Sequence, residues 1–218
     1  MQASIEAARR QMVSQQVRTW DVLDPRVLEA LTAVPRERFV PEAFRDVAFA
    51  DAPIPLGHGQ HLLPAKTDGR ILQSLAIEAG NEVLDVGTGS GFLAACMAHR
   101  GGRVRSLEIF PDLVARATAN LGAAGFTQVA VEVADASRFA EFDRYDAIAV
   151  SAALPAYDRR FELALKVGGR LFLVVGRRPV MTAKLVVRVG ANEWIAENLF
   201  ETEFDPMINA TGPSAFRF

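Results

Sequence analysis

The chain has 218 residues, of which 50% are hydrophobic, with 24 Lys and Arg against 26 Asp and Glu and a single Cys. This length suits one large domain, or a domain with an appendage, and allows a substantial hydrophobic core. The balanced charge gives no electrostatic footprint for nucleic acid or for an anionic membrane surface, so we expect neither partner. One Cys cannot form an internal disulfide, and the polar amino terminus lacks the apolar core of a secretory signal, so we expect a cytoplasmic protein without a membrane span.

Two helices and an irregular segment precede the predicted sheet. Residues 4–19 are rich in helix formers, and Asp24 followed by Pro25 is typical of an N-cap with Pro in the first turn of a second helix. Between residues 35 and 64, Pro and Gly recur too often for long elements. Irregular segments of this length are often functional in compact domains.

Helices and strands alternate from residue 66 onward. The pattern predicts helices at 66–79, 92–99, 112–121 and 161–165, and strands at 83–86, 104–108, 129–133, 145–150 and 171–175. Residues 184–189 and 193–200 are typical of a closing antiparallel pair. We therefore predict an α/β, Rossmann-like fold with a mostly parallel sheet and helices on both faces. Its parts are N-terminal helices and a loop (1–65), a ligand-binding core (66–180) and C-terminal strands that complete the same domain (181–218).

The most informative segment is a buried strand that leads directly into a glycine-rich turn. Val83, Leu84 and Val86 form its apolar run, and Asp85 interrupts it. Gly87, Gly89 and Gly91 then allow positive φ and close approach of the backbone to a ligand. Open α/β sheets bind ligands beyond the carboxyl ends of their strands, which is where this turn is expected.

The residues around the turn indicate which ligand it binds. Phe92 stands where a dinucleotide fingerprint needs its third Gly, and no Gly-Lys-Ser or Gly-Lys-Thr follows to hold a phosphate. Carboxylates instead close three successive predicted strands, at Asp85, Glu108 and Asp135. Glu108 follows the turn by roughly 20 residues, the distance at which an acid meets ribose hydroxyls in Rossmann-like folds. A ligand with a cationic amine, a ribose and an adenine amine, such as S-adenosylmethionine, suits this arrangement.

Several motifs spread over nearly the whole chain resemble one family, the protein-L-isoaspartate O-methyltransferases. They are Ala30-Leu-Thr-Ala-Val-Pro-Arg-Glu-Arg-Phe-Val-Pro41, Asp51-Ala-Pro-Ile-Pro-Leu-Gly-His-Gly-Gln60 and Val83-Leu-Asp-Val-Gly-Thr-Gly-Ser-Gly-Phe92, with Ser151-Ala-Ala153 and Gly168-Gly169 at the expected places. The resemblance implies a Rossmann-like methyltransferase that binds S-adenosylmethionine and releases S-adenosylhomocysteine. The cofactor-binding residues expected on this basis are Asp85, Gly87, Thr88, Gly89, Ser90, Gly91, Glu108 at the ribose, Asp135 and Ala136 near the adenine, and Ser151.

The substrate loop departs from the family's pattern. In the family, the Gln that corresponds to Gln60 is followed by Thr-Ile-Ser, whose Ser is taken to help the isoaspartyl carboxylate react. This chain has Gln60-His-Leu-Leu-Pro64, with Leu63 at the position of that Ser. Leucine cannot donate a hydrogen bond to a desolvated carboxylate. The resemblance assigns Asp51, His58, Gln60, Leu62 and Pro64 to the substrate loop and places Leu63 at the catalytic position of the family's Ser. His61 is a second candidate catalytic residue because of its imidazole, not because of the resemblance.

The acceptor is therefore open at the level of the sequence. It is a protein or peptide carboxylate, as in the family, or another group, including one on a small molecule. A hydroxyl or amine acceptor would need a base, which His61 or His58 could supply because imidazole titrates near neutral pH. We expect no metal site, since these two His residues lack a third ligand at suitable spacing. The alternatives include a non-catalytic sensor or partner subunit that binds the cofactor, and either a monomer or a homodimer.

Overall fold

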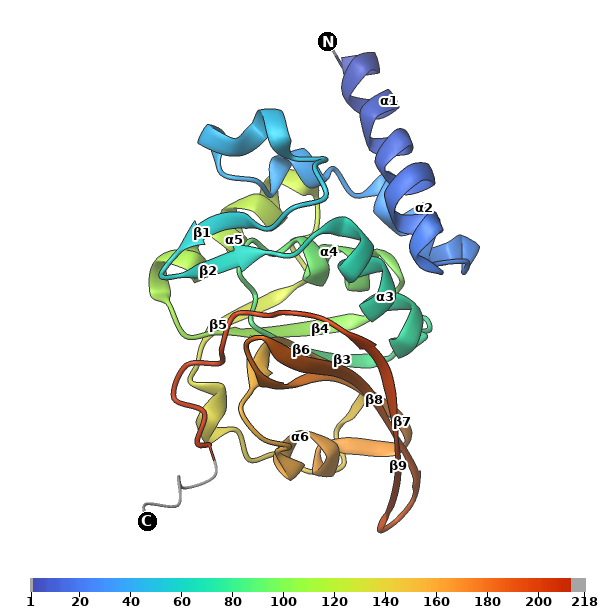
Figure 1. Cartoon of the computed structure of the whole chain (residues 1–218), viewed down its shortest axis with the longest axis vertical. Coiled ribbons are helices and arrows are strands. Elements are labelled where there is room, and N and C mark those ends of the chain that lie inside the picture. The colour runs from blue at the N-terminus through green and yellow to red at the C-terminus, as the bar shows by residue number, and fades with distance from the viewer. Residues whose placement is uncertain (1, 213–218) are drawn as a thin grey trace.

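The computed structural model describes residues 2–212, which form a seven-stranded sheet and a separate two-stranded hairpin (Figure 1). The strand order is β5 (Ala130–Val133), β4 (Arg103–Glu108), β3 (Glu82–Val86), β6 (Tyr145–Leu154), β7 (Leu165–Arg177), β8 (Val180–Gly190) and β9 (Glu193–Glu201). Neighbours from β5 to β7 are parallel, and β7, β8 and β9 pair antiparallel. The predicted Rossmann-like fold with C-terminal antiparallel strands is confirmed.

Both faces of the sheet are covered because side chains alternate along each buried strand. One face packs against the helices α3 (Ala65–Leu75), α4 (Phe92–His99) and α5 (Pro111–Ala124), and the other packs against α6 (Arg159–Leu163). In β6, for example, Ala147 and Ala149 belong to the first core, whereas Ile148 and Val150 belong to the second. Figure 1 shows α3 and α4 above the sheet and α6 below it.

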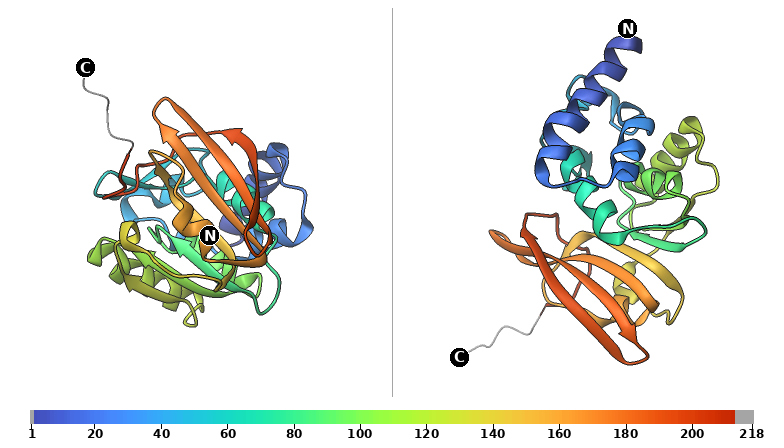
Figure 2. Two further views of the ribbon diagram at one scale, coloured as in Figure 1. Left: turned by 90° about the horizontal axis from the view of Figure 1, so that it is seen from below. Right: turned by 90° about the vertical axis from the view of Figure 1, so that its right-hand side faces the viewer.

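The N-terminal segment forms a helical layer over the first core. Helix α1 (Gln2–Met12) continues into a π-helical turn and a 3-10 turn that end at Trp20, so the predicted helix 4–19 is not α-helical throughout. Helix α2 (Pro25–Ala33) begins as predicted, with the Asp24 side chain accepting a hydrogen bond from the Arg26 amide. A Cβ on Gly69 of α3 would lie 2.9 Å from Val17, which explains a glycine inside that helix. Figure 2 shows this layer and the C-terminal strands at opposite ends of the molecule.

Several predicted boundaries shift. Helix α3 ends at Leu75 rather than 79, because Ala76 adopts a left-handed conformation. Leu165, predicted as helix, begins β7, and both β7 and β8 extend well beyond their apolar centres through antiparallel pairing. The irregular segment holds 3-10 helices and the hairpin of β1 (Ile54–Gly57) and β2 (Gln60–Leu62).

The division of the chain at residues 65 and 180 stays a prediction, and residues 1 and 213–218 at its ends lie outside the described part. Within residues 2–212, no helix has both the length and the apolar character that crossing a bilayer requires.

Candidate active site

The glycine turn after β3 has the conformation that its sequence predicts. Gly87, Gly89 and Gly91 all have positive φ, of 96°, 53° and 87°. The Gly87 amide donates to the Leu107 carbonyl at 2.9 Å, which ties the turn to β4. A Cβ on Gly89 would lie 3.0 Å from Leu56 Cδ1 of the hairpin. The turn therefore needs glycine for its backbone conformation and, at Gly89, for the space beside the hairpin.

Two adjacent cavities lie beyond the carboxyl ends of the parallel strands. Strand β3 pairs with β4 on one side and β6 on the other, so the chain changes direction here, and such switch points are where open α/β sheets bind ligands. We call the first the loop cavity, about 570 Å³, because residues of the β1–β2 hairpin and the following loop line it. The second, the strand-end cavity, is about 420 Å³ and follows the ends of β4 and β5. Both are lined by Gln60, Gly87, Glu108 and Ala152.

Glu108 lies where the two cavities meet, at the end of β4. Its carboxylate accepts hydrogen bonds from the backbone amides of Gly89 at 2.9 Å, Ile109 at 2.8 Å and Phe110 at 3.1 Å. The side chain is thus fixed by the glycine turn on one side and by its own strand end on the other. It is ready to accept further hydrogen bonds, because an ionised carboxylate offers about four lone-pair positions.

Asp85 is buried beneath the turn and lines neither cavity within the described residues. Its Oδ2 accepts from the Ser106 hydroxyl at 2.7 Å, and its Oδ1 has no partner in residues 2–212. Burial raises the pKa of Asp85 to about 7, the Ser106 hydrogen bond opposes this shift, and the negative charges of Glu108 and Asp68 add to it. The group is a buried carboxyl whose ionised form a nearby cation would stabilise.

The other predicted cofactor residues, apart from Gly91, line the cavities. Thr88 and Ser90 line the loop cavity together with Ser151, whose hydroxyl is buried and has no partner among the described residues. Asp135 and Ala136 line the strand-end cavity. The Asp135 side chain accepts from the Ser137 amide at 2.9 Å and from Asn209 at 3.0 Å, and the first of these hydrogen bonds is the main reason that its pKa is lowered. Gly91 packs against Leu121 of α5 instead.

The substrate loop brings His61 against a residue that lies 144 positions further along the chain. His61 Nδ1 lies 2.9 Å from Asp205 Oδ2, and both residues line the loop cavity. The other oxygen of Asp205 accepts from Arg178 Nη2 at 3.2 Å. Asp205 is held in place because the Ala153 amide donates to its carbonyl at 2.8 Å. An aspartate, a histidine and an arginine thus form one chain of polar contacts at the cavity wall.

Leu63 lines the loop cavity beside a buried ion pair. Arg36, fully buried, donates to Asp68 Oδ2 at 3.0 Å, to the Leu63 carbonyl at 2.5 Å and to the Ala48 carbonyl at 3.0 Å. Asp68 also lines the cavity. Burial raises the pKa of Asp68 to about 7, against the opposing effect of Arg36. The pair fixes the backbone of the substrate loop at Leu63.

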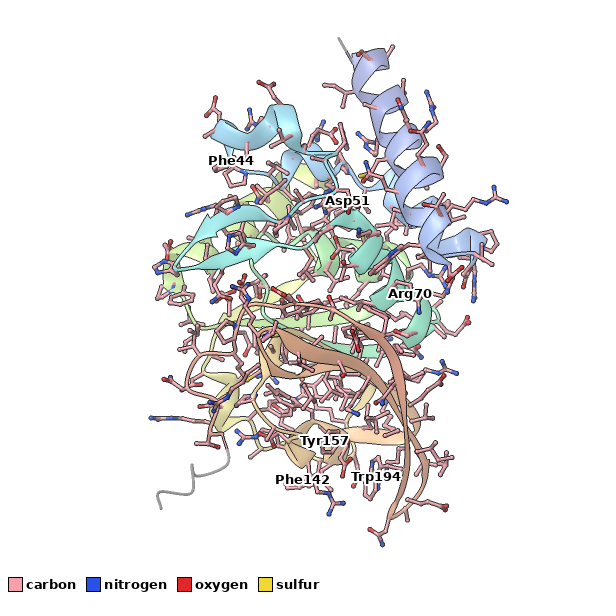
Figure 3. The ribbon with its side chains drawn as sticks, in the orientation of Figure 1. Phe44, Asp51, Arg70, Phe142, Tyr157 and Trp194 are labelled. Carbon is pink, nitrogen blue, oxygen red and sulfur yellow. The ribbon has the colours of Figure 1, made fainter. Side chains whose placement is uncertain are left out.

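Three of the expected loop residues lie outside both cavities. His58 Nε2 lies 2.9 Å from Asp112 Oδ1, and the His58 ring stacks on Phe110 with the centroids 4.0 Å apart. Asp51, labelled in Figure 3, pairs with Lys66 at 2.6 Å. Pro64 accepts from the amides of Thr67 and Asp68 and so begins α3. Gln60 and Leu62, by contrast, line the loop cavity.

The sequence did not indicate Arg36, Asp68, Arg178 or Asp205 as site residues. Arg36 belongs to the motif at residues 30–41, but Glu37 and Arg38 beside it are also charged, so the sequence did not single it out. Asp68 and Asp205 carried no local signal, because they reach the cavity only through tertiary contacts.

No group of three His, Cys, Asp or Glu side chains in residues 2–212 is arranged to hold a metal ion. A further open cavity of about 1020 Å³, with Tyr157 and Trp194 in its wall, lies at the opposite end of the molecule from Asp51 (Figure 3).

Known proteins resemble this chain over most of its length. The chain matches the family model "Protein-L-isoaspartate(D-aspartate) O-methyltransferase (PCMT)" over residues 7–212. It is 36% identical over 211 residues to protein-L-isoaspartate O-methyltransferase 1 of Rhodopseudomonas palustris (strain HaA2), which covers 96% of this chain and 86% of the relative. It is 35% identical over 222 residues to protein-L-isoaspartate O-methyltransferase of Staphylothermus marinus, which covers 97% of this chain and 99% of the relative.

Solved structures share the fold. A crystal structure from Plasmodium falciparum, described as a PCMT in complex with S-adenosyl-L-homocysteine, superimposes with a TM-score of 0.82 at 19% identity, over 91% of this chain and 97% of that one. A second structure, named protein-L-isoaspartate O-methyltransferase, gives a TM-score of 0.80 at 20% identity, over 93% of this chain and 67% of the other. On the family match and the identity to these relatives, the chain belongs to the protein-L-isoaspartate (D-aspartate) O-methyltransferase family.

Proposed function

We propose that this chain methylates the side-chain carboxylate of L-isoaspartyl residues in proteins or peptides. As a member of its family, the chain is an S-adenosylmethionine-dependent methyltransferase. The observation that carries the choice of site is that the loop cavity and the strand-end cavity adjoin and share Gly87 and Glu108 in their walls. A methyl donor that extends through this junction would meet the acceptor beside the substrate loop.

The chemistry of the lining residues supports the cofactor. Glu108 and Asp135 offer carboxylate oxygens to the ribose hydroxyls and the adenine amine, at the ends of neighbouring strands. The Ser151 hydroxyl, which has no partner within residues 2–212, is a buried polar atom in the wall of the loop cavity, and a bound polar ligand is a natural partner for it. The positive charges of S-adenosylmethionine's ammonium and sulfonium groups also suit three nearby carboxyl groups, those of Asp85, Glu108 and Asp68.

The reaction requires alignment of the acceptor oxygen, the methyl carbon and the sulfur, and it does not require a nucleophilic side chain. A carboxylate oxygen of the acceptor attacks the methyl carbon, the carbon–sulfur bond breaks, and its electron pair stays on sulfur, so an ester and a thioether result without proton transfer. This chain's residues hold the acceptor in line and exclude water. Leu62, Leu63 and Leu56 supply an apolar wall for this purpose. The Arg36 hydrogen bond to the Leu63 carbonyl fixes that wall.

Two other readings have less support. A non-catalytic sensor would not need a cavity that continues from the cofactor residues to the substrate loop. A small-molecule acceptor fits the volume of the loop cavity, but the names of the relatives give protein isoaspartate as the substrate of those proteins. The isoaspartyl carboxylate is therefore the acceptor to test first.

The test is a methyl-transfer assay with radiolabelled S-adenosylmethionine on an isoaspartyl peptide. The matched control is the same peptide with a normal aspartyl linkage. We expect labelled ester, released as methanol by base, from the isoaspartyl peptide alone, and no label with the Gly89→Val variant. Labelling of neither peptide by an enzyme that binds S-adenosylhomocysteine normally would overturn the proposal, and an unbiased methylation screen of cell extract would then find the true acceptor.

We also propose a cytoplasmic location and either a monomer or a homodimer. The location is supported by the single Cys96, which is fully buried and unpaired, as is usual in a reducing compartment.

A further inference from the structure

His61 is the only basic side chain among the described residues that line the loop cavity. The acidic residues of the same wall are Asp68, Glu108 and Asp205. Two of them are already engaged, because Asp68 pairs with Arg36 and Glu108 accepts three backbone amides. A negatively charged acceptor that enters this cavity therefore has one side chain from which to obtain a compensating positive charge.

The hydrogen-bonding state of the His61 ring leaves one nitrogen for a ligand. Nδ1 is occupied by Asp205 at 2.9 Å, and the ring has no other hydrogen-bond partner within residues 2–212. If imidazole is neutral with its proton on Nδ1, Nε2 can only accept. If imidazole is protonated, Nε2 donates. Only the protonated ring can donate to a carboxylate while it keeps the contact with Asp205.

Most of the charged groups that face His61 are carboxyl groups. The Asp205 side chain is only 12% exposed, so its charge is poorly screened, and it lies directly against Nδ1. The other charged groups that face this pair are Arg178, which contacts the far oxygen of Asp205, and Asp68 and Glu108 across the cavity. His61 therefore faces three carboxyl groups and one guanidinium.

We propose that His61, oriented by Asp205, binds the acceptor carboxylate as a protonated imidazole and replaces the hydrogen-bond donor that Leu63 lacks. This inference rests on the proposed function, because it names the group that recognises the acceptor of that reaction. It assigns Asp205 and Arg178 as positioning residues. It also differs from a role of His61 as a base, because a cation that binds carboxylate works at low pH and a base works at high pH.

The test measures binding of an isoaspartyl peptide to the full chain saturated with S-adenosylhomocysteine, by isothermal titration at pH 6 and pH 8, beside methyl transfer. We expect wild-type affinity to fall as the pH rises. His61→Ala should weaken binding at pH 6 by about 10- to 100-fold, the usual effect of losing a hydrogen bond to a charged group. His61→Gln, which keeps a donor without the charge, should restore part of the affinity and remove its pH dependence.

Two further variants separate positioning from simple damage to the fold. Asp205→Asn keeps the shape of the side chain but removes the charge. The pH above which peptide binding weakens should therefore be lower than in wild type. His99→Ala removes a histidine that also pairs with a carboxylate, Glu29 at 3.0 Å, but lies outside both cavities, and it should leave peptide binding unchanged. Unchanged affinity for S-adenosylhomocysteine in every variant shows that the cofactor site is intact.

The outcomes distinguish this inference from the proposed function. Methyl ester formation that is as fast in His61→Ala as in wild type, or that rises with pH in a His61-dependent manner, overturns the role of His61 and leaves the proposed function standing. Peptide binding with the expected pH dependence but no ester overturns the proposed function alone. Absence of pH-dependent binding in wild type overturns the inference directly.

Discussion

The site has two halves, a strand-end half around Glu108 and a loop half around His61 and Arg36. They differ in how far apart in the chain the residues joined by hydrogen bonds lie. Glu108 takes its hydrogen bonds from amides no more than 19 positions away. His61 and Asp205 are 144 positions apart, and Arg36 and Asp68 are 32 apart. The first half is built mainly by the backbone of one strand–turn–helix unit and its neighbours, and the second by side chains from distant segments. Substitutions in the loop half can therefore alter the substrate while the strand-end half, which binds the cofactor, stays the same.

The largest effect should come from breaking the buried ion pair of the loop half. Arg36→Met leaves the buried Asp68 without a partner, and the carbonyls of Ala48 and Leu63 without their donor. Removing one member of a buried pair costs about 3–5 kcal/mol. For a chain of this size, that lowers the melting temperature by roughly 10 °C.

The melting temperature of Arg36→Met can be measured by thermal unfolding followed by circular dichroism. Arg45→Met, an exposed arginine of the same irregular segment, is the control and should melt like wild type. Equal stability of both variants would show that the loop half does not depend on the pair.

The next effect should be on the cofactor half. Gly89→Val places a β-branched residue at φ 53° and brings its Cβ against Leu56, so the turn must shift. Strain of this kind costs about 1–3 kcal/mol before the clash is counted, and we expect affinity for S-adenosylhomocysteine to fall by about 100-fold. Gly122→Ala, with open space around its Cβ, is the matched control in isothermal titration. Normal affinity in Gly89→Val would remove the turn from the site.

Glu108→Gln should weaken cofactor binding less than the glycine variant. The amide keeps the size of the side chain but loses the charge that accepts the Gly89, Ile109 and Phe110 amides, and hydrogen bonds to charged groups are worth about 1.5–3 kcal/mol. We expect about a tenfold or greater loss of affinity for S-adenosylhomocysteine. Glu197→Gln on the exposed face of β9 serves as the control. A variant that binds as tightly as wild type would exclude Glu108 as a ribose ligand.

A smaller effect should follow pH through Asp85. Burial raises the pKa of Asp85 to about 7, so the ionised fraction increases between pH 6 and pH 8. A cationic ligand favours the ionised form, so by linkage S-adenosylhomocysteine should bind about fivefold more tightly at pH 8 than at pH 6. Adenosine, which lacks the amino-acid ammonium group, should show no such rise in affinity. Asp85→Asn should abolish the rise for S-adenosylhomocysteine. A rise of the same size in Asp85→Asn would assign the pH dependence to another group.

The smallest effect is expected at His58. This histidine pairs with the exposed Asp112 and stacks on Phe110, outside both cavities. We expect His58→Ala to change kcat/KM for the isoaspartyl peptide by less than about threefold, because exposed ion pairs contribute little. A large loss would mean that the β1–β2 turn moves onto the acceptor during the reaction.

Much of the fold could be predicted because its signals are local. Apolar runs marked the buried centres of β3, β6 and β7, and the Asp24-Pro25 pair marked the start of α2 correctly. The errors came at the boundaries of elements. Strand β8 extends back to Val180 because it pairs with β7 along its length, which is a tertiary contact. Helix α3 stops early because Ala76 adopts a left-handed conformation that a non-Gly residue rarely adopts.

The sequence by itself determined the glycine turn, the acids at the strand ends and the altered substrate loop. These are properties of a few neighbouring residues. A strand that runs into a glycine turn places its ligand-binding residues at the edge of the sheet. Only the tertiary structure decided that Asp205 and Arg178 support His61, that Arg36 and Asp68 fix Leu63, and that His58 turns away. Those contacts join segments that meet only after the sheet has formed, and no local pattern records which distant charge a buried side chain will meet.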